Sequence, residues 1–337
     1  MAAKSARERR MIAWGWNSIT ELEFNSGFRS YYHDDIIGEE GKWKELAPEL
    51  LAKIFEKVGL EQRILDVPFV CKSWHKVLRS DPECWKSLNF QQLSHLRRRG
   101  RPKFAVRFSR TYLFDGFFSF SGVLKLLARV GGAAVEEIVF SKNDDITIDA
   151  LAFAAEKCPG VKTLALPLLE GKHGRMGYDK RLPSVIGKWK DLESFSMVEK
   201  GNAFVKILQE LGANCEKFAE LSIQGAINHW EASAITDFLP KIKRLHFCDS
   251  YLLREPLVKL LDGCKELQVL DLKSVICFKA DEEIQSKASR IKTFDVKRTR
   301  YLTEEESNDP WDDYDDIGLT VSSDDDGGCM QDMTDIL

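Results

Sequence analysis

The sequence predicts an α/β protein in which a small helical unit precedes an array of strand–loop–helix repeats. Two observations predict this arrangement. Apolar side chains recur at helical spacing in two stretches between residues 43 and 90, and a six-residue apolar pattern recurs seven times between residues 135 and 296. With 337 residues, the chain is long enough for both parts.

The composition is that of a folded protein without a membrane anchor. The chain is 44% hydrophobic and contains 20 phenylalanines and 8 tryptophans to fill cores. No apolar run approaches the roughly 20 residues that a membrane helix needs. Residues 1–16 lack the apolar stretch and small residues of a secretory signal. We therefore expect the protein in the nucleus, the cytoplasm or both.

The eight cysteines are scattered, and no two form a C-x-x-C pair. This distribution favours buried thiols in a reducing compartment over disulfides, and it gives no basis for a structural zinc site. Motifs for phosphate binding, serine hydrolysis or zinc proteolysis do not occur in the sequence. The sequence therefore predicts no metal, no cofactor and no catalytic residue.

The helical unit contains two amphipathic segments. The first covers residues 46–60, and the second covers residues 70–78. At 100° per residue, Cys71 and Trp74 lie on the apolar face of the second segment, and His75 lies at its edge. A thiol among apolar neighbours is unreactive, so this cysteine and histidine are interpreted as packing residues and not as a catalytic pair.

The order of apolar residues in this unit, from Trp43 to Trp85, resembles an F-box. The sequence "VCKSW" at residues 70–74 with a downstream tryptophan is fairly specific in this spacing. The resemblance implies helices that dock on a Skp-type adaptor and through it join a cullin-based ubiquitin ligase. The adaptor-binding residues that it implies are Leu46, Pro48, Leu50, Leu51, Ile54, Phe55, Val70, Cys71, Trp74 and Trp85.

The remainder of the chain is repetitive. The pattern Φ-x-x-Φ-x-Φ starts at residues 135, 161, 192, 218, 242, 267 and 291, with spacings of 26, 31, 26, 24, 25 and 24. Three of the pattern starts, at residues 161, 218 and 267, are preceded by a cysteine at a distance of three residues. These equivalent positions assign Cys158, Cys215 and Cys264 to the core of the repeats. Amphipathic segments lie between the patterns, so each unit is predicted to be strand, loop and helix.

This period and pattern resemble the leucine-rich repeat, which stacks a parallel sheet inside a curved solenoid with helices outside. Box and repeats together resemble the plant F-box proteins with leucine-rich repeats. The resemblance implies the substrate-recognition subunit of an SCF-type (Skp–cullin–F-box) ligase, which brings a target protein to the ligase and is not itself an enzyme.

In such repeats, the residues between the apolar positions line the concave face. For the last three strands these residues are charged, which suits a protein or peptide partner. A solvated sheet face that binds nothing is an equally good interpretation of any single one of them. The predicted target-binding residues are Arg244, His246, Asp271, Lys273, Asp295 and Lys297.

The predicted boundaries are an N-terminal extension with little order at 1–40, the F-box at 43–90, a basic linker at 91–104, the repeats at 105–302 and an acidic disordered tail at 303–337. The tail has thirteen acidic and no basic residues, so residues 1–302 have 40 acidic and 49 basic residues and a net charge of +9. Such a tail cannot bury enough apolar surface to fold alone. It is interpreted as solubilising, and an interaction or phosphorylation segment around Ser322 and Ser323 is the alternative.

Arg99-Gly100-Arg101-Pro102 resembles the core of an AT-hook, in which extended arginines enter the minor groove of DNA. A single four-residue match favours a basic linker or import patch over DNA binding. The alternative function is a non-catalytic repeat scaffold, or a nuclear protein associated with nucleic acid, whose helical unit only caps the array. The target and any bridging small molecule remain open at this point.

Overall fold

The computed structural model describes residues 46–93, 97–98, 101–111, 119–142, 144, 146–167, 180–198, 200–248, 251–272, 276–277, 281–295 and 300–301. The predicted N-terminal extension and acidic tail lie outside these residues, as does Trp43. By its contacts the chain forms two compact units. One runs to Val139 and includes Asp149–Cys158, and the other comprises Phe140–Ile148 and the residues from Pro159 on.

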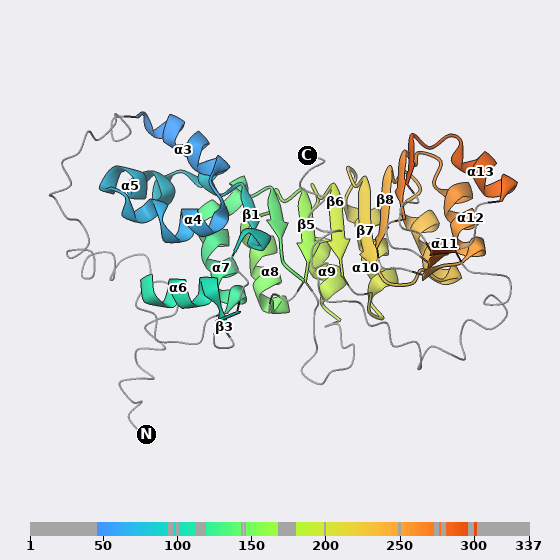
Figure 1. Ribbon diagram of the computed structural model, residues 1–337, viewed down its shortest axis with the longest axis horizontal. Helices are drawn as coiled ribbons and strands as arrows, with labels where there is room; N and C mark the ends of the chain where they lie inside the picture. The colour runs from blue at the N-terminus through green and yellow to red at the C-terminus, as the bar shows by residue number, and fades with distance from the viewer. Residues whose placement is uncertain are drawn as a thin grey trace, which may run out of the picture. The chain divides into compact units, whose positions relative to one another are not determined.

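The first unit begins with short helices (Figure 1). Proline in the first turn, Glu49 near the N-terminus and Lys57 near the C-terminus all favour the first helix. That helix ends before Gly59, and a separate helix starts at the next residue. The elements are α3 (Pro48–Lys57), α4 (Leu60–Leu65), η3 (Val67–Phe69), α5 (Lys72–Ser80) and η4 (Pro82–Trp85).

A buried arginine joins these helices. The Arg63 guanidinium donates hydrogen bonds to the carbonyl oxygen of Cys84 and, at 2.9 Å, to that of Ser87. It also lies 5.8 Å from the centre of the Trp85 ring, whose Nε1 donates to the Leu78 carbonyl at 2.9 Å. Burial lowers the pKa of Arg63 to about 10. The predicted box tryptophan therefore belongs to the internal packing of the unit.

The segment predicted as a basic linker contains regular structure. It includes η5 (Phe90–Gln92), the antiparallel pair β2 (Arg97–Arg98) and β3 (Arg101–Pro102), and the start of α6 (Lys103–Thr111). Arg107 of α6 forms ion pairs with Glu61 at 2.5 Å and Asp66 at 2.8 Å. These ion pairs connect α6 to the residues of α4 and its C-terminal end.

The first unit also contains the first parallel pair of the sheet. Strand β1 (Ser87–Asn89) pairs in parallel with β4 (Glu137–Val139), and the chain between them forms α6, α7 (Phe120–Gly131) and η6 (Gly132–Ala134). Helix α8 (Ile148–Lys157) follows. Because β1 directly follows η4, the helical unit passes into a repeat-type strand without a spacer.

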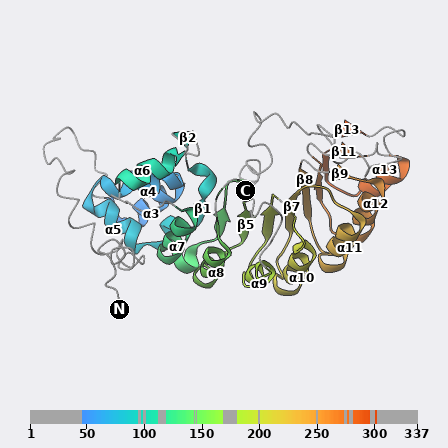
Figure 2. The ribbon, with the colours of Figure 1, turned by 90° about the horizontal axis from the view of Figure 1, so that it is seen from below.

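The second unit continues the alternation of strands and helices (Figure 1). Figure 2 shows helices α9 to α12 on one face of the strands. The strands are β5 (Thr163–Leu166), β6 (Ser194–Met197), β7 (Glu220–Gln224), β8 (Arg244–Cys248), β10 (Val269–Asp271) and β12 (Thr293–Asp295). The helices are α9 (Leu182–Ile186), α10 (Phe204–Asn214), α11 (His229–Phe238), α12 (Arg254–Gly263) and α13 (Glu282–Ala288).

The main sheet has the strand order β1-β4-β5-β6-β7-β8-β10-β12. Every pair in it whose register is described is parallel. The predicted α/β class, a helical unit followed by parallel strands backed by helices, is thus confirmed. The sequence pattern did not predict the second, smaller parallel sheet, which consists of β9 (Tyr251–Leu252), β11 (Ile276–Cys277) and β13 (Arg300–Tyr301).

The apolar pattern forms the core because equivalent residues stack in the sheet. From β5 to β10, the middle Φ position of each repeat pairs with that of the next, and these side chains are fully buried. From β5 to β10 they are Leu164, Phe195, Leu221, Leu245 and Leu270. Each unit thereby covers the apolar face of its neighbour.

Three repeat cysteines are buried free thiols, as expected. Cys158 donates to the Ala128 carbonyl at 3.6 Å, and Cys215 donates to the Trp189 carbonyl at 3.2 Å. Burial raises the pKa of Cys158 and Cys264 to about 12 and that of Cys215 to about 11, which leaves them unreactive. The expectation of thiols throughout was wrong for Cys248, which is joined in a disulfide.

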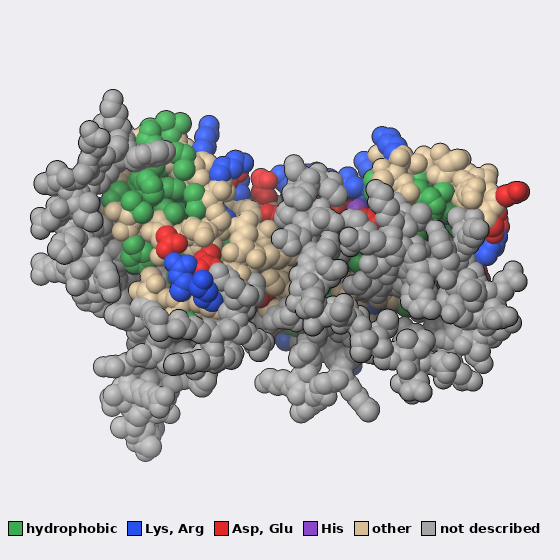
Figure 3. Space-filling view, in the orientation of Figure 1, with side chains coloured by type: hydrophobic (Ala, Val, Ile, Leu, Met, Phe, Trp, Pro, Cys, Tyr) green, Lys and Arg blue, Asp and Glu red, His purple; other side chains and the backbone are tan. Residues whose placement is uncertain are grey.

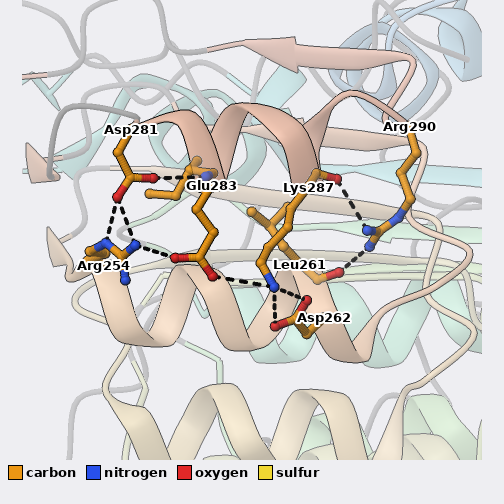
Figure 4. Close-up of polar contacts among 8 residues, drawn as sticks. Arg254, Leu261, Asp262, Asp281, Glu283, Lys287 and Arg290 are labelled. Atoms are coloured by element: carbon orange, nitrogen blue, oxygen red, sulfur yellow. Dashed lines mark hydrogen bonds and ion pairs between the residues drawn. The ribbon is translucent and has the colours of Figure 1, made fainter.

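The last described helix is held by polar contacts (Figure 4). Arg254 pairs with Asp281 at 2.8 Å and with Glu283, and Lys287 pairs with Asp262 at 2.6 Å. Arg290 donates to the carbonyl oxygens of Leu261 and Cys264 at the end of α12. These carbonyls have no partner within the helix, so Arg290 serves as a cap.

Replacement of Gly212 by alanine tests the contact between α10 and α11. An added Cβ would overlap the Phe238 carbonyl oxygen, so Gly212→Ala should lower the free energy of unfolding by about 1–3 kcal/mol. In an open helix, the same change would stabilise by about 1 kcal/mol. Denaturant unfolding measures the sign, and Gln209→Ala on the exposed face of α10 is the control. Stabilisation by Gly212→Ala would contradict the close contact.

Replacement of Arg63 tests the connection between the short helices. Arg63→Met keeps most of the volume but leaves the Cys84 and Ser87 carbonyls without their donor. Each buried carbonyl left unpaired costs about 1–3 kcal/mol, so unfolding should require distinctly less denaturant. Arg79→Met on the exposed side of α5 should change stability by less than about 0.5 kcal/mol. Equal effects of the two substitutions would refute the role of Arg63.

Candidate functional site

An exposed apolar surface lies on the helices of the first unit. Leu50 in α3 is 50% exposed and Val70, directly after η3, is 51% exposed. Figure 3 shows hydrophobic side chains gathered in one patch over α3 and α5. Among the described residues, only Val205 and Trp230 of the second unit are other large hydrophobic side chains with comparable exposure. The first unit therefore presents apolar side chains that its own core does not use.

The buried side of the same helices explains this surface. Leu51 and Phe55 are buried, and the Phe55 ring meets the Trp74 ring edge to face with 5.2 Å between centroids. Ile54, one turn after Leu50, is half-buried. Helix α3 is thus apolar over a wider arc than its contact with α5 and η4 covers. Pro48, Leu50 and Ile54 of α3, together with Val70 and Trp74, are exposed or half-buried, and we call these five residues the apolar surface of the box.

The ten residues predicted to bind an adaptor divide by burial. Those that are buried hold the unit together and cannot themselves contact a partner. The buried residues are Leu51, Phe55, Cys71 and Trp85; the half-buried residues are Leu46, Ile54 and Trp74; the exposed residues are Pro48, Leu50 and Val70.

In the second unit, charged side chains meet on three adjacent strands. Arg244 Nε lies 2.5 Å from a carboxylate oxygen of Glu220. His246 Nε2 lies 3.5 Å from the other oxygen of Glu220, and its Nδ1 lies 3.6 Å from Asp271. The imidazole is therefore placed between two carboxylates. We call Glu220, Arg244, His246 and Asp271 the charged cluster.

The register of the sheet builds this cluster. Arg244 pairs with Glu220 of β7, and His246 pairs with Ser222 of β7 and Asp271 of β10. Three predicted target-binding residues, Arg244, His246 and Asp271, thus lie together.

Sequence reasoning missed Glu220, although it stands one repeat period before Arg244. Asp295 continues the row of His246 and Asp271 in β12, and its side chain lies outside the described residues. Lys273 and Lys297 lie outside them altogether.

Two of the four AT-hook-like residues lie in a strand pair. Arg101 and Pro102 form β3, which pairs antiparallel with β2. A minor-groove arm, in contrast, follows the groove in an extended form. Arg99 and Gly100 lie outside the described residues.

The described residues show neither a metal site nor a membrane span. Across the described part of the chain, no group of three or more histidine, cysteine, aspartate or glutamate side chains is arranged to hold a metal ion. Likewise, none of the described helices is both long and apolar enough to cross a membrane.

The known proteins to which the chain is similar in sequence are F-box proteins. No family model matches the chain. It is 29% identical to an F-box/LRR-repeat protein of Arabidopsis thaliana over 270 residues, which cover 75% of this chain and 83% of the relative. The Arabidopsis F-box proteins FBW2 and SKIP19 are 25% and 24% identical, over 76% and 86% of this chain and 74% and 89% of their own lengths.

Each alignment covers three quarters or more of this chain, and the fold combines a helical unit with repeated strands and helices. In sequence and in architecture, the chain is therefore similar to plant F-box proteins with leucine-rich repeats.

Proposed function

We propose that the protein is the substrate-recognition subunit of an SCF-type ubiquitin ligase. In this role the F-box binds a Skp-type adaptor and through it a cullin, and the repeats bind a target protein for ubiquitination and degradation. The protein supplies proximity between target and ligase and no catalytic group. The nucleus and the cytoplasm, where such ligases act, are the proposed locations.

The apolar surface of the box carries this proposal. Leu51 and Phe55 are buried and complete the core of the helical unit. Leu50 and Val70 are exposed to water and therefore add no folding stability to the unit. Exposed apolar patches of this kind mark protein-binding surfaces. An amphipathic helix that lays such side chains into a partner groove is a recurrent mode of recognition. Adaptor binding therefore explains why these apolar side chains are exposed although they do not stabilise the fold.

The charged cluster supports a protein target. Its members come from three adjacent strands, and a partner that crosses these strands would contact Arg244 directly. Glu220, His246 and Asp271 are nearly buried, and Arg244 is the more exposed member. Hydrogen-bonding side chains held this firmly lose little entropy on binding and can distinguish partners by charge.

One observation favours the alternative, in which the helical unit caps the array. Strand β1 pairs with β4, so the unit contributes a strand to the sheet. Capping needs only the buried side of the helices, whereas adaptor binding needs the exposed side. Substitutions confined to exposed positions therefore distinguish the two roles, because they should weaken adaptor binding and leave capping unchanged.

Leu50→Ala combined with Val70→Ala tests adaptor binding. Both side chains are half exposed, so the free energy of unfolding should change little. In a complex, burial of each side chain should contribute roughly 1 kcal/mol to the binding free energy. The dissociation constant for a Skp-type adaptor should rise roughly 10- to 30-fold, measured by calorimetry with the full chain. Trp230→Ala in the repeats, at a residue 78% exposed, is the control and should not alter it.

Two results would oppose the proposal. A folded wild-type chain that binds no Skp-type adaptor would favour the capping alternative. A double variant that binds as tightly as the wild type would show that the apolar surface of the box is not the binding surface.

Arg244→Gln combined with Asp271→Asn tests target binding by the charged cluster. The target proteins that the wild type recovers from plant tissue with the proteasome blocked should be lost, because both charges are neutralised with little change of shape. Adaptor binding should be unchanged. Lys206→Gln on α10 is the control. Equal recovery of targets by the variant would place target recognition elsewhere.

A further inference from the structure

A group of lysines lies where the last strands of the main sheet begin. Lys243 directly precedes β8 and Lys292 directly precedes β12, whereas Lys241 and Lys265 lie in the turns before β8 and β10. Because these strands are parallel and in register, the residues before them lie at one edge of the sheet. All four side chains are exposed. We call these four residues the lysine edge.

The backbone fixes the spacing of this edge. The Gln268 amide donates to the Lys243 carbonyl at 2.8 Å, and the Thr293 amide donates to the Gln268 carbonyl at 3.1 Å. Lys243 and Lys292 are therefore two strands apart, about 10 Å in a regular sheet.

The fold does not neutralise the lysine edge. Lys217 and Lys287 pair with Asp191 and Asp262, but within the described residues the four edge lysines form no ion pair. In the turns that precede β8, β10 and β12, Glu266 is the single acidic residue, and Arg290 adds a further positive charge. The edge is therefore a cationic surface that an anionic chain can occupy.

The same chain contains a segment of matching charge. Residues 303–337 include thirteen acidic and no basic residues, with aspartates grouped at 312–316 and 324–326. The segment follows β13 closely, in the repeat that contains Lys292. Its 35 residues reach up to about 115 Å when extended, whereas a three-residue strand such as β12 spans only about 10 Å. A tether of this length allows the acidic segment to reach every lysine of the edge.

We propose that the acidic segment 303–337 docks on the lysine edge of its own molecule. Attachment gives the segment an effective concentration of the order of millimolar, so weak individual ion pairs suffice. The docked segment shields the edge from other polyanions, including nucleic acid and acidic proteins. It acts at the edge where the strands begin. The proposal does not depend on the proposed ligase role.

Zero-length carbodiimide cross-linking of the full chain tests the proposal, because it joins a carboxylate to a lysine only at direct contact. Peptide mapping of the monomer should find residues 303–337 linked to Lys241, Lys243, Lys265 and Lys292. At 1 M salt, where the Debye length is about 3 Å, these links should be largely lost. In the variant with all four lysines changed to glutamine, tail links to any lysine should fall at least about fivefold, the combined effect of four exposed ion pairs.

The control changes two exposed lysines that lie outside the edge, one on α3 and one on α10. Lys53→Gln combined with Lys206→Gln should leave the yield of edge links unchanged. Circular dichroism checks that each variant is folded. Tail links spread evenly over all exposed lysines would overturn the proposal. Links that form only between molecules and rise with protein concentration would overturn it in favour of a second copy as the occupant. Absence of tail links in a folded chain would also overturn it.

Discussion

The parallel, in-register stacking of the strands is the constraint on which the rest of the structure depends. A single repeat cannot bury its own apolar face, so each must cover the next. Once Leu221 pairs with Leu245 and Leu245 with Leu270, every other position of the repeat is also aligned with its equivalents. The positions of the core, the charged cluster and the lysine edge therefore all follow from one register and have the same structural origin.

The charged cluster illustrates how the register combines residues that are far apart in the sequence. Glu220, Arg244 and Asp271 are separated by 24 and 27 residues, but they lie on adjacent strands about 5 Å apart. Their mutual pairing holds each side chain in place before any partner arrives. Such preorganisation favours specific recognition, because the partner does not have to order these groups.

In the helical unit, different residues of one helix serve two needs. Helix α3 packs Leu51 and Phe55 inward against its neighbours and presents Leu50 outward. Arg63 donates hydrogen bonds to two carbonyl oxygens at a position where a larger protein would have a hydrophobic core. A unit of such short helices needs these hydrogen bonds because it buries little apolar surface. The unit is thus complete without a partner and still retains an apolar face for one.

The sequence by itself determined the fold class, the period of the repeats, the inward direction of their apolar positions and the burial of Cys158, Cys215 and Cys264, because these follow from local periodicity. Only the tertiary structure decided which box residues are core and which are surface. Leu50 and Leu51 are neighbours of one type, and packing against α5 and η4 separates them. It also decided that Glu220 belongs with Arg244 and that β1 joins the sheet, because strand pairing acts between residues that no local pattern connects.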